Sequence, residues 1–200
     1  MKILNLVEFA PINIPFERRM QTLGVFFFVF MFMQGLSLIG VSTIIYLFFT
    51  QFYWISIAYL VWMFFDLDRC NKGGRVSRWA RNWTIWKYYC RYFPIELVKT
   101  TDLDPEKNYL FCVSPHGVMC FGIFGNFATE GNDFSYKFPG ITPHLLTLNA
   151  QFTSPLMREI FMMSGACSAS EKSIKYILNN EGRCAKKGQV YIILIQIFII

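Results

Sequence analysis

A long uncharged stretch near the N-terminus constrains this chain more than any other feature. Met20–Phe65 contains 46 residues without a single charged side chain, and it lies between Arg19 and Asp66. One straight helix of that length would extend about 69 Å, more than twice a ~30 Å hydrocarbon core. Two spans of about 20 residues would fit, with a turn near Gly40–Thr43, where small and β-branched residues interrupt the Phe-rich sequence. We therefore predict a two-helix transmembrane hairpin over residues 20–65.

The basic residues on either side of this stretch predict its orientation. Two arginines precede it and five basic residues follow it: Arg18, Arg19, Arg69, Lys72, Arg75, Arg78 and Arg81. Positively charged flanks remain on the cytoplasmic side of a membrane, so we expect a multi-pass protein with both ends of the hairpin in the cytosol. The alternative interpretation is a buried helix pair in the core of a soluble protein.

Composition excludes several classes of protein. Apolar residues make up 54% of the chain, aromatic residues 18% and charged residues 16%, against roughly 25% charged in average soluble proteins. Intrinsic disorder is excluded because disordered chains are poor in aromatic residues and rich in charge. The net charge of +6 lies beside the apolar stretch, which favours membrane lipid over nucleic acid as the partner. The six cysteines form no C-x-x-C pair, so we expect free or buried thiols and no metal site.

The segment after the hairpin combines tryptophans with basic residues. Trp79, Trp83 and Trp86 have the spacing of one face of a helix. Four cations alternate with them: Arg78, Arg81, Lys87 and Arg91. This composition is typical of a membrane–water interface, although a core face of a globular helix would show the same spacing. Pro94 ends the segment, which therefore predicts a helix over residues 76–93.

Three apolar segments in the second half of the chain predict strands of an α/β domain. Tyr109–Val113 is continuously apolar, which is typical of a strand buried on both faces, and the Asp104–Pro105 turn precedes it. His144–Leu148 is a second candidate. Val190–Ile200 is apolar and β-branched, and we expect it to lie within a sheet because it would promote aggregation if exposed.

Two helices are predicted between the second and third strands. Ser154–Pro155 supplies an N-cap and an N1 proline for a helix that Gly165 ends. The sequence Ser168–Glu171 matches a capping box for a further helix, which Gly182 can terminate.

The chain contains two histidines, and only one is a strong candidate for catalysis. His116 lies between Pro115 and Gly117 directly after a predicted buried strand, where α/β folds place active-site groups. Its imidazole can act as a general base, and backbone amides at Gly117 can stabilise an oxyanion; a structural histidine is the alternative. Glu130 is the nearest downstream carboxylate that could orient the ring, whereas His144, next to Pro143 in a polar turn, is expected to be structural. A serine hydrolase is disfavoured because no G-x-S-x-G is present, and neither a phosphate loop nor a dinucleotide fingerprint occurs.

Nine short motifs stand out along the chain: Val7–Pro11, Glu17–Arg19, Gln21–Leu23, Trp83–Lys87, Tyr92–Ile95, Leu97–Thr100, Asp102–Pro105, Pro115–Gly117 and Phe138–Ile141. Together they resemble one family of lipid-synthesising enzymes, the monoacylglycerol, type 2 diacylglycerol and wax alcohol acyltransferases. The resemblance is colinear from about residue 6 to about residue 182.

The resemblance implies an activity and a location. Members of this family are anchored by a hairpin in the endoplasmic reticulum membrane and transfer fatty acyl groups from acyl-CoA to glycerolipid hydroxyls. We expect monoacylglycerol as the acceptor and diacylglycerol as the product, with diacylglycerol or a long-chain alcohol as alternative acceptors. Acyl-CoA would be a co-substrate, and no cofactor or metal is expected.

The resemblance also implies site residues. The family signature His-Pro-His-Gly corresponds to Ser114–Gly117, so His116 is the implied catalytic histidine, and Ser114 replaces the first histidine of the motif. Pro115 and Gly117 complete the motif, with Ser114 as a candidate substrate contact. The candidates for binding CoA phosphates are Arg158, Lys172 and Lys175.

The end of the chain departs from the family. Family members continue well past residue 200, and Cys184–Ile200 does not follow their pattern. We therefore expect a C-terminally truncated member, with a cytosolic segment 1–19, the hairpin 20–65, an interfacial segment 66–99 and an incomplete α/β acyltransferase-like domain 100–200. The alternative function is that of a catalytically inactive, membrane-bound partner that forms homo- or hetero-oligomers with family members.

Overall fold

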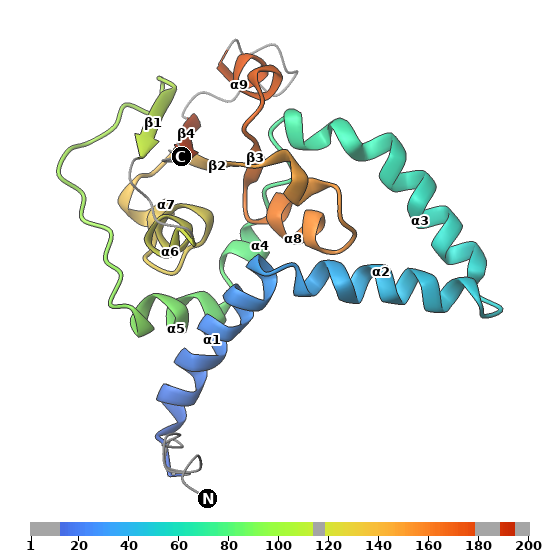
Figure 1. Cartoon of the computed structure of the whole chain (residues 1–200). Helices are drawn as coiled ribbons and strands as arrows, with labels where there is room; N and C mark the ends of the chain where they lie inside the picture. Colours follow the sequence, from blue (N-terminus) through green and yellow to red (C-terminus); the bar gives the residue numbers. More distant parts are fainter. Residues whose placement is uncertain (1–12, 114–118, 179–188, 195–200) are drawn as a thin grey trace, which may run out of the picture.

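The computed structural model describes residues 13–113, 119–178 and 189–194 (Figure 1). Three helices form its N-terminal part: α1 (Phe16–Phe32), α2 (Gly35–Phe48) and α3 (Tyr53–Asp66). The short helices η2 (Leu67–Asn71), α4 (Arg78–Arg81) and α5 (Thr84–Tyr92) connect them to a region that contains a small sheet. Among the described residues, helix predominates over strand.

The uncharged stretch forms three helices, and the turn predicted at Gly40–Thr43 is wrong because these residues lie inside α2. The first break lies at Gln34, whose left-handed φ of +65° separates α1 from α2 by a bend of 64°. Residues 40–43 lie inside α2 instead. Gly40 serves close packing, because a Cβ there would lie 2.8 Å from the carbonyl oxygen of Pro155. A small residue inside a helix can therefore mark a contact as well as a turn.

The lengths of these helices decide whether any one of them could cross a membrane. Among the described residues, no helix is by itself long and apolar enough to cross a bilayer, whereas α1 and α2 pass that test jointly as a bent pair. At about 1.5 Å per residue, α2 and α3 are each about 21 Å long.

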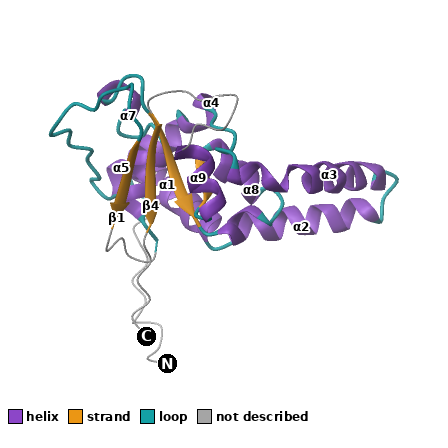
Figure 2. Cartoon of the chain, turned by 90° about the horizontal axis from the view of Figure 1, so that it is seen from above, coloured by secondary structure: helices purple, strands orange, loops and turns teal. Residues whose placement is uncertain are grey.

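Helices α2 and α3 form an antiparallel pair that projects away from the rest of the chain (Figures 1 and 2). Apolar side chains on both helices and their connection are exposed, with Phe49 at 87%. On these two helices the buried residues are small: Gly35, Ser37, Gly40 and Ser56. This pair is therefore not the buried core of a globular domain, which was the alternative interpretation.

Helix α1 belongs to the core instead. Its ring at Phe28 packs against Tyr89, Phe121 and Phe124, with centroids 4.7–5.3 Å apart. Gly24 allows α1 to approach α5 closely, because a Cβ at Gly24 would lie 3.0 Å from the carbonyl oxygen of Ile85. One face of α1 is thus buried in the core, whereas α2 and α3 expose most of their apolar side chains.

The helix predicted over residues 76–93 is interrupted at 82–83, and its three tryptophan rings, although in contact with one another, differ in exposure. Trp79 is 70% exposed, whereas Trp86 is 2% exposed and its Nε1 donates to the carbonyl oxygen of Ala80 at 2.8 Å. Arg81, one of the predicted interfacial cations, is buried. The prediction of an interfacial helix is wrong for Trp86 and Arg81, because both pack into the core.

Four parallel strands form the sheet: β1 (Tyr109–Val113), β2 (Thr142–Thr147), β3 (Ala166–Ser168) and β4 (Gln189–Leu194). Their order is β1-β4-β2-β3, so the last strand in sequence lies between the first two. The three predicted strands are confirmed: Tyr109–Val113 has the predicted bounds, β2 begins two residues before His144 and ends one residue before Leu148, and β4 begins one residue before Val190, while residues 195–200 lie outside the described ranges. The expectation that β1 is buried on both faces is wrong, because β1 is an edge strand and Leu110 is 42% exposed.

The remaining helices pack around this sheet. They are α6 (Phe121–Ile123), the π-helix η3 (Phe124–Ala128), α7 (Phe134–Lys137), η4 (Asn149–Phe152), α8 (Met157–Met163) and α9 (Glu171–Leu178). Helix α8 begins after Leu156, two residues later than predicted, and ends before Gly165 as predicted, where φ is +93°. Ser170, not Ser168, accepts the hydrogen bond from Ser173 N at the start of α9, because Ser168 still belongs to β3. The predicted stop at Gly182 lies outside the described residues.

Candidate functional site

The predicted catalytic motif follows directly from the end of β1. Ser114, Pro115, His116 and Gly117 lie outside the described residues, but β1 ends at Val113 and the chain is described again from Met119. The motif is therefore attached to the carboxyl end of a parallel strand. In open α/β sheets, ligands bind outside the carboxyl ends of the strands.

The segment after the motif is anchored in the core. Cys120 adopts a left-handed φ of +51°, after which α6 and η3 follow. The Tyr89 hydroxyl donates to the carbonyl oxygen of Phe121 at 2.9 Å. Burial raises the pKa of Tyr89, so this hydroxyl remains a donor at neutral pH. One flank of the motif is thus a strand and the other is a segment held by α5 and α1.

Glu130 has a different partner from the one expected. Its Oε1 accepts from Arg81 Nη2 at 3.0 Å, from Arg81 Nε at 3.2 Å and from the Ser135 hydroxyl at 2.8 Å. Its Oε2 accepts from Ser135 N at 2.9 Å. Arg81 also donates to the carbonyl oxygens of Phe127 and Ser164, both at 2.9 Å. Burial lowers the pKa of Arg81, and Glu130 opposes that shift. The buried pair of Arg81 and Glu130 connects α4 to η3 and α8. No local sequence pattern predicts this pair.

His144 lies within β2 rather than in a turn. Its side chain is buried, and Nδ1 is 3.5 Å from Cys167 Sγ on the neighbouring strand β3. Burial raises the pKa of Cys167 to about 12, so its thiol is protonated at neutral pH and is a poor nucleophile. This environment agrees with a structural role for His144.

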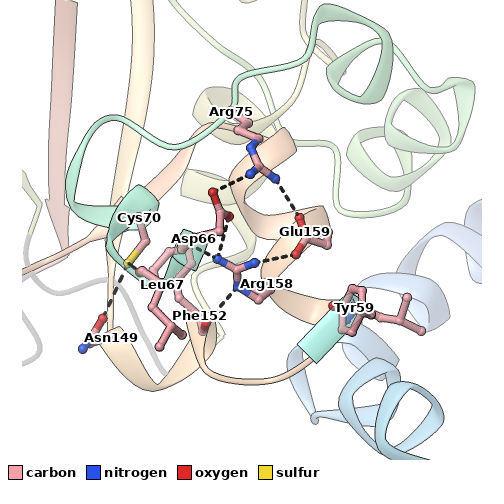
Figure 3. A network of polar contacts seen from close by, with 10 residues as sticks. Tyr59, Asp66, Leu67, Cys70, Arg75, Asn149, Phe152, Arg158 and Glu159 are labelled. Carbon is pink, nitrogen blue, oxygen red and sulfur yellow. Dashed lines mark hydrogen bonds and ion pairs between the residues drawn. The ribbon is translucent and has the colours of Figure 1, made fainter. Parts of the chain in front are cut away.

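Arg158 is fully buried in a network of four charged side chains (Figure 3). Its Nη2 donates to Asp66 Oδ2 at 3.0 Å, and its Nη1 donates to Glu159 Oε1 at 2.8 Å. Arg75 bridges the same two carboxylates, and both guanidinium groups lie over the Trp62 ring, 4.8 and 5.7 Å from its centroid. With these contacts satisfied inside the protein, Arg158 is not placed to bind a CoA phosphate. It instead joins the end of α3 to α8.

The two candidate lysines lie on the surface of α9. Lys172 Nζ is 2.6 Å from Asp68 Oδ1, and Lys175 Nζ is 2.5 Å from Glu171 Oε1. Hydrogen bonding from Lys172 lowers the pKa of Asp68. Helix α9 begins at Glu171, after β3 ends at Ser168, so its N-terminus lies at the carboxyl end of the parallel sheet. Three steps between strands, at about 4.8 Å each, separate β3 from β1 by roughly 14 Å.

No group of three or more His, Cys, Asp or Glu side chains within the described ranges could hold a metal ion. Five cysteines are described, and none of them forms a disulfide bond with another described cysteine: Cys70, Cys90, Cys112, Cys120 and Cys167.

An all-parallel sheet with helical connections is the arrangement of α/β proteins, and a histidine motif after the first strand is a common position for an active site. The chain matches the diacylglycerol acyltransferase family over residues 45–196 and belongs to that family. The acyltransferase resemblance of the short motifs is thereby confirmed.

Curated relatives agree with this assignment. The chain is 44% identical to 2-acylglycerol O-acyltransferase 1 of Bos taurus over 176 residues, which is 88% of this chain and 52% of the relative. It is 48% identical to diacylglycerol O-acyltransferase 2 of Homo sapiens over 118 residues, 59% of this chain and 30% of the relative. The chain thus spans about half the length of the first of these relatives and about a third of the second. No solved structure matches it significantly.

Proposed function

We propose that this chain carries the membrane-bound, histidine-bearing part of an acyl-CoA:monoacylglycerol O-acyltransferase that produces diacylglycerol. The observation that carries the proposal is 44% identity to a 2-acylglycerol O-acyltransferase over 88% of the chain. The identity to diacylglycerol O-acyltransferase 2 covers a smaller share, 59%, which makes diacylglycerol the second choice of acceptor. A long-chain alcohol is the third.

His116 acts as the general base in this proposal. It takes the proton from the acylglycerol hydroxyl while that oxygen attacks the thioester carbonyl of acyl-CoA. Backbone amides around Gly117 stabilise the oxyanion, a contribution of about 3–4 kcal/mol per donor in other enzymes. The C–S bond then breaks, and the departing CoA thiolate takes the proton from the imidazolium. Ser114 replaces a histidine beside this group and contacts substrate without titrating.

Attachment to a membrane is part of this proposal, and the exposed apolar side chains of the helix pair α2–α3 support it. We propose that these side chains enter the bilayer and that both ends of the pair lie on the cytosolic side, as the basic flanks favour; the endoplasmic reticulum is the location that the family resemblance implies. Because α2 and α3 are each about 21 Å long, the pair passes the middle of a ~30 Å hydrocarbon core without crossing it fully. Lys172 and Lys175 on α9 are the candidates for binding the CoA phosphates, because Arg158 is buried and bonded to Asp66 and Glu159.

Transfer of a radiolabelled acyl group from acyl-CoA to monoacylglycerol by microsomes that contain the chain tests the proposal. His116→Ala should lower turnover by about 10²- to 10⁴-fold, as expected for removal of a general base. Ser114→His, which restores the family motif, should keep or raise activity, and His144→Ala is a matched histidine control with a milder effect. Substantial, equal activity in the wild type and His116→Ala would contradict the assigned base.

A further inference from the structure

The end of α3 combines exposed apolar side chains with exposed cations. Phe64 and Phe65 lie in the last turn of α3 and both are exposed, Phe65 at 81%. The apolar surface of the helix pair therefore extends to the point where the chain leaves α3. Two exposed cations follow within seven residues, Arg69 in η2 and Lys72 directly after it. Figure 1 shows α9 next to this end of α3, and the contacts between α9 and η2 agree with that view.

A third cation reaches this surface from a distant part of the sequence. The Ser170 hydroxyl, at the start of α9, donates to Asn71 Oδ1 at 2.7 Å and so holds α9 against η2. Lys172 Nζ then lies 2.6 Å from Asp68 Oδ1, while Lys72 Nζ lies 3.0 Å from Asp68 Oδ2. Two ammonium groups from different elements thus share one carboxylate.

This cluster has more positive charge than its carboxylate neutralises. Hydrogen bonding from Lys172 lowers the pKa of Asp68, so its carboxylate is ionised at neutral pH. Within the described ranges Arg69 forms no ion pair, and Lys72 and Lys172 each have Asp68 as their one ion-pair partner. Three cations around a single carboxylate leave a surplus of positive charge. Each ammonium group also has three N–H donors, so one shared carboxylate leaves some of them for another acceptor.

The turn beside the cluster is open. Gly73 and Gly74 follow Lys72 with left-handed φ values of +83° and +64°. A Cβ at Gly73 would meet no atom within 4 Å, so no other part of the described chain packs against that side of the turn. A ligand can therefore approach Lys72 there without displacing protein.

The combination of charges and apolar rings favours one kind of occupant. A soluble anion would satisfy the cations but would leave Phe64 and Phe65 in water. An anionic phospholipid supplies phosphate oxygens for the cations and acyl chains for the rings, and basic residues at the end of an apolar helix attract such lipids. We propose that Arg69, Lys72 and Lys172 bind the phosphate of an anionic phospholipid whose acyl chains lie along α3. The inference rests on the membrane attachment proposed above and does not depend on acyl transfer.

Lipid retention by the purified full chain tests this inference. The chain in neutral detergent is mixed with equal amounts of dioleoylphosphatidic acid and dioleoylphosphatidylcholine and repurified, and the retained lipids are measured by mass spectrometry. The wild type should retain roughly 20-fold more phosphatidic acid than phosphatidylcholine. Arg69→Gln with Lys72→Gln should lower this preference by roughly tenfold or more, because each cation near an anionic surface contributes about fivefold.

Lys87→Gln with Arg91→Gln is the matched control. It removes the same charge from two exposed cations of α5, outside the cluster, and should keep the preference of the wild type. A second measurement needs no variant and is therefore independent of folding defects. In nanodiscs, acetylation of Lys72 should slow at least tenfold when phosphatidic acid is added to phosphatidylcholine, whereas exposed Lys107, before the opposite edge strand β1, should keep its rate.

Four outcomes would overturn the inference. They are equal retention of the two lipids by the wild type, equal loss of preference in the two double variants, an unchanged acetylation rate of Lys72, and release of phosphatidic acid by an equal concentration of inorganic phosphate or CoA. The last would assign the cluster to a soluble phosphate compound, such as the co-substrate for which Lys172 is a candidate. Preferential retention of phosphatidic acid by a chain that transfers no acyl group would support this inference and contradict the proposed reaction.

Discussion

The α2–α3 pair and strand β1 both expose apolar side chains, yet they need different partners. In the helix pair each backbone amide inside a helix is bonded within that helix, so apolar lipid can surround it. In β1 the side chains and half of the backbone groups are exposed together. The comparison teaches that apolar exposure alone does not indicate a membrane; whether the backbone is satisfied decides between lipid and protein.

Charged substitutions should separate the two surfaces with the largest effect. Ile45→Asp combined with Ile57→Asp places two carboxylates on exposed positions of α2 and α3. A charge at the centre of a membrane helix costs about 2.5–3.5 kcal/mol, so the pair costs about 5–7 kcal/mol. Flotation in a density gradient should show the double variant leaving the membrane fraction.

The matched control is Leu110→Asp, which changes the other apolar surface. It should float with membranes like the wild type, because β1 is not assigned to lipid. If the double variant floats normally, or if Leu110→Asp is released from membranes as well, the distinction between the two surfaces is wrong.

The joint between the two regions should give the next largest effect. Asp66→Ala leaves Arg158 fully buried without the carboxylate that bonds its Nη2, and removing one partner of a buried pair typically costs about 3–5 kcal/mol. For a chain of this size, 1 kcal/mol shifts Tm by about 2–4 °C, so we expect a decrease of roughly 6–20 °C in detergent.

Lys172→Ala is the control for this prediction, since its pair with Asp68 is exposed and such pairs contribute about 0–1 kcal/mol. The double variant Asp66→Asn with Arg158→Met should recover part of the lost Tm, because it removes the buried charges together. Equal Tm values for Asp66→Ala and Lys172→Ala would show that the network does not join α3 to α8.

A smaller effect should distinguish two cysteines on opposite edge strands of the sheet, Cys112 on β1 and Cys167 on β3. Cys167 is buried and its pKa is raised to about 12, so it remains protonated at pH 8, whereas Cys112 is exposed. Iodoacetamide at pH 8 should label Cys112 at least 100-fold faster than Cys167 in the folded chain. Because the folded-state pKa is raised, the contribution of the neutral thiol to stability is present below about pH 8.5 and is lost as pH rises toward 12. Comparable labelling of both thiols would mean that α9 does not cover Cys167 on β3.

Sequence patterning predicted β1, β2 and β4 because their apolar segments are short and bounded, but it missed β3, whose three residues Ala166–Ser168 are too few to show a pattern. The uncharged stretch is visible in the sequence, but the positions at which it breaks into three helices are not, since a uniformly apolar segment has no local signal for a break. The break at Gln34 depends on tertiary contacts: its Nε2 donates to Gln151 Oε1 at 2.9 Å, 117 positions away in the sequence. The sequence did not reveal that one face of α1 is buried while α2 is exposed, because no charged residue separates the two helices and no local pattern marks the buried face.

The charged residues were harder to assign. Arg81 lies in a basic segment that suggested a membrane flank, and Arg158 was a candidate for a phosphate contact. Both are instead buried against carboxylates. Their partners lie 49 and 92 positions away, which no local motif encodes. The family motif at 114–117 could be identified because it is contiguous, and His116 remains a prediction.

Hydrogen–deuterium exchange of the full chain in lipid nanodiscs tests most directly whether α2–α3 contacts lipid and the open edge of β1 does not. We predict that the amides of Gly35–Phe48 and Tyr53–Asp66 exchange slowly in nanodiscs. The amides of Tyr109–Val113 that face the open edge should exchange at least tenfold faster than those helix amides. Fast exchange throughout α2 and α3, or slow exchange at the open edge of β1, would contradict the distinction between the two surfaces.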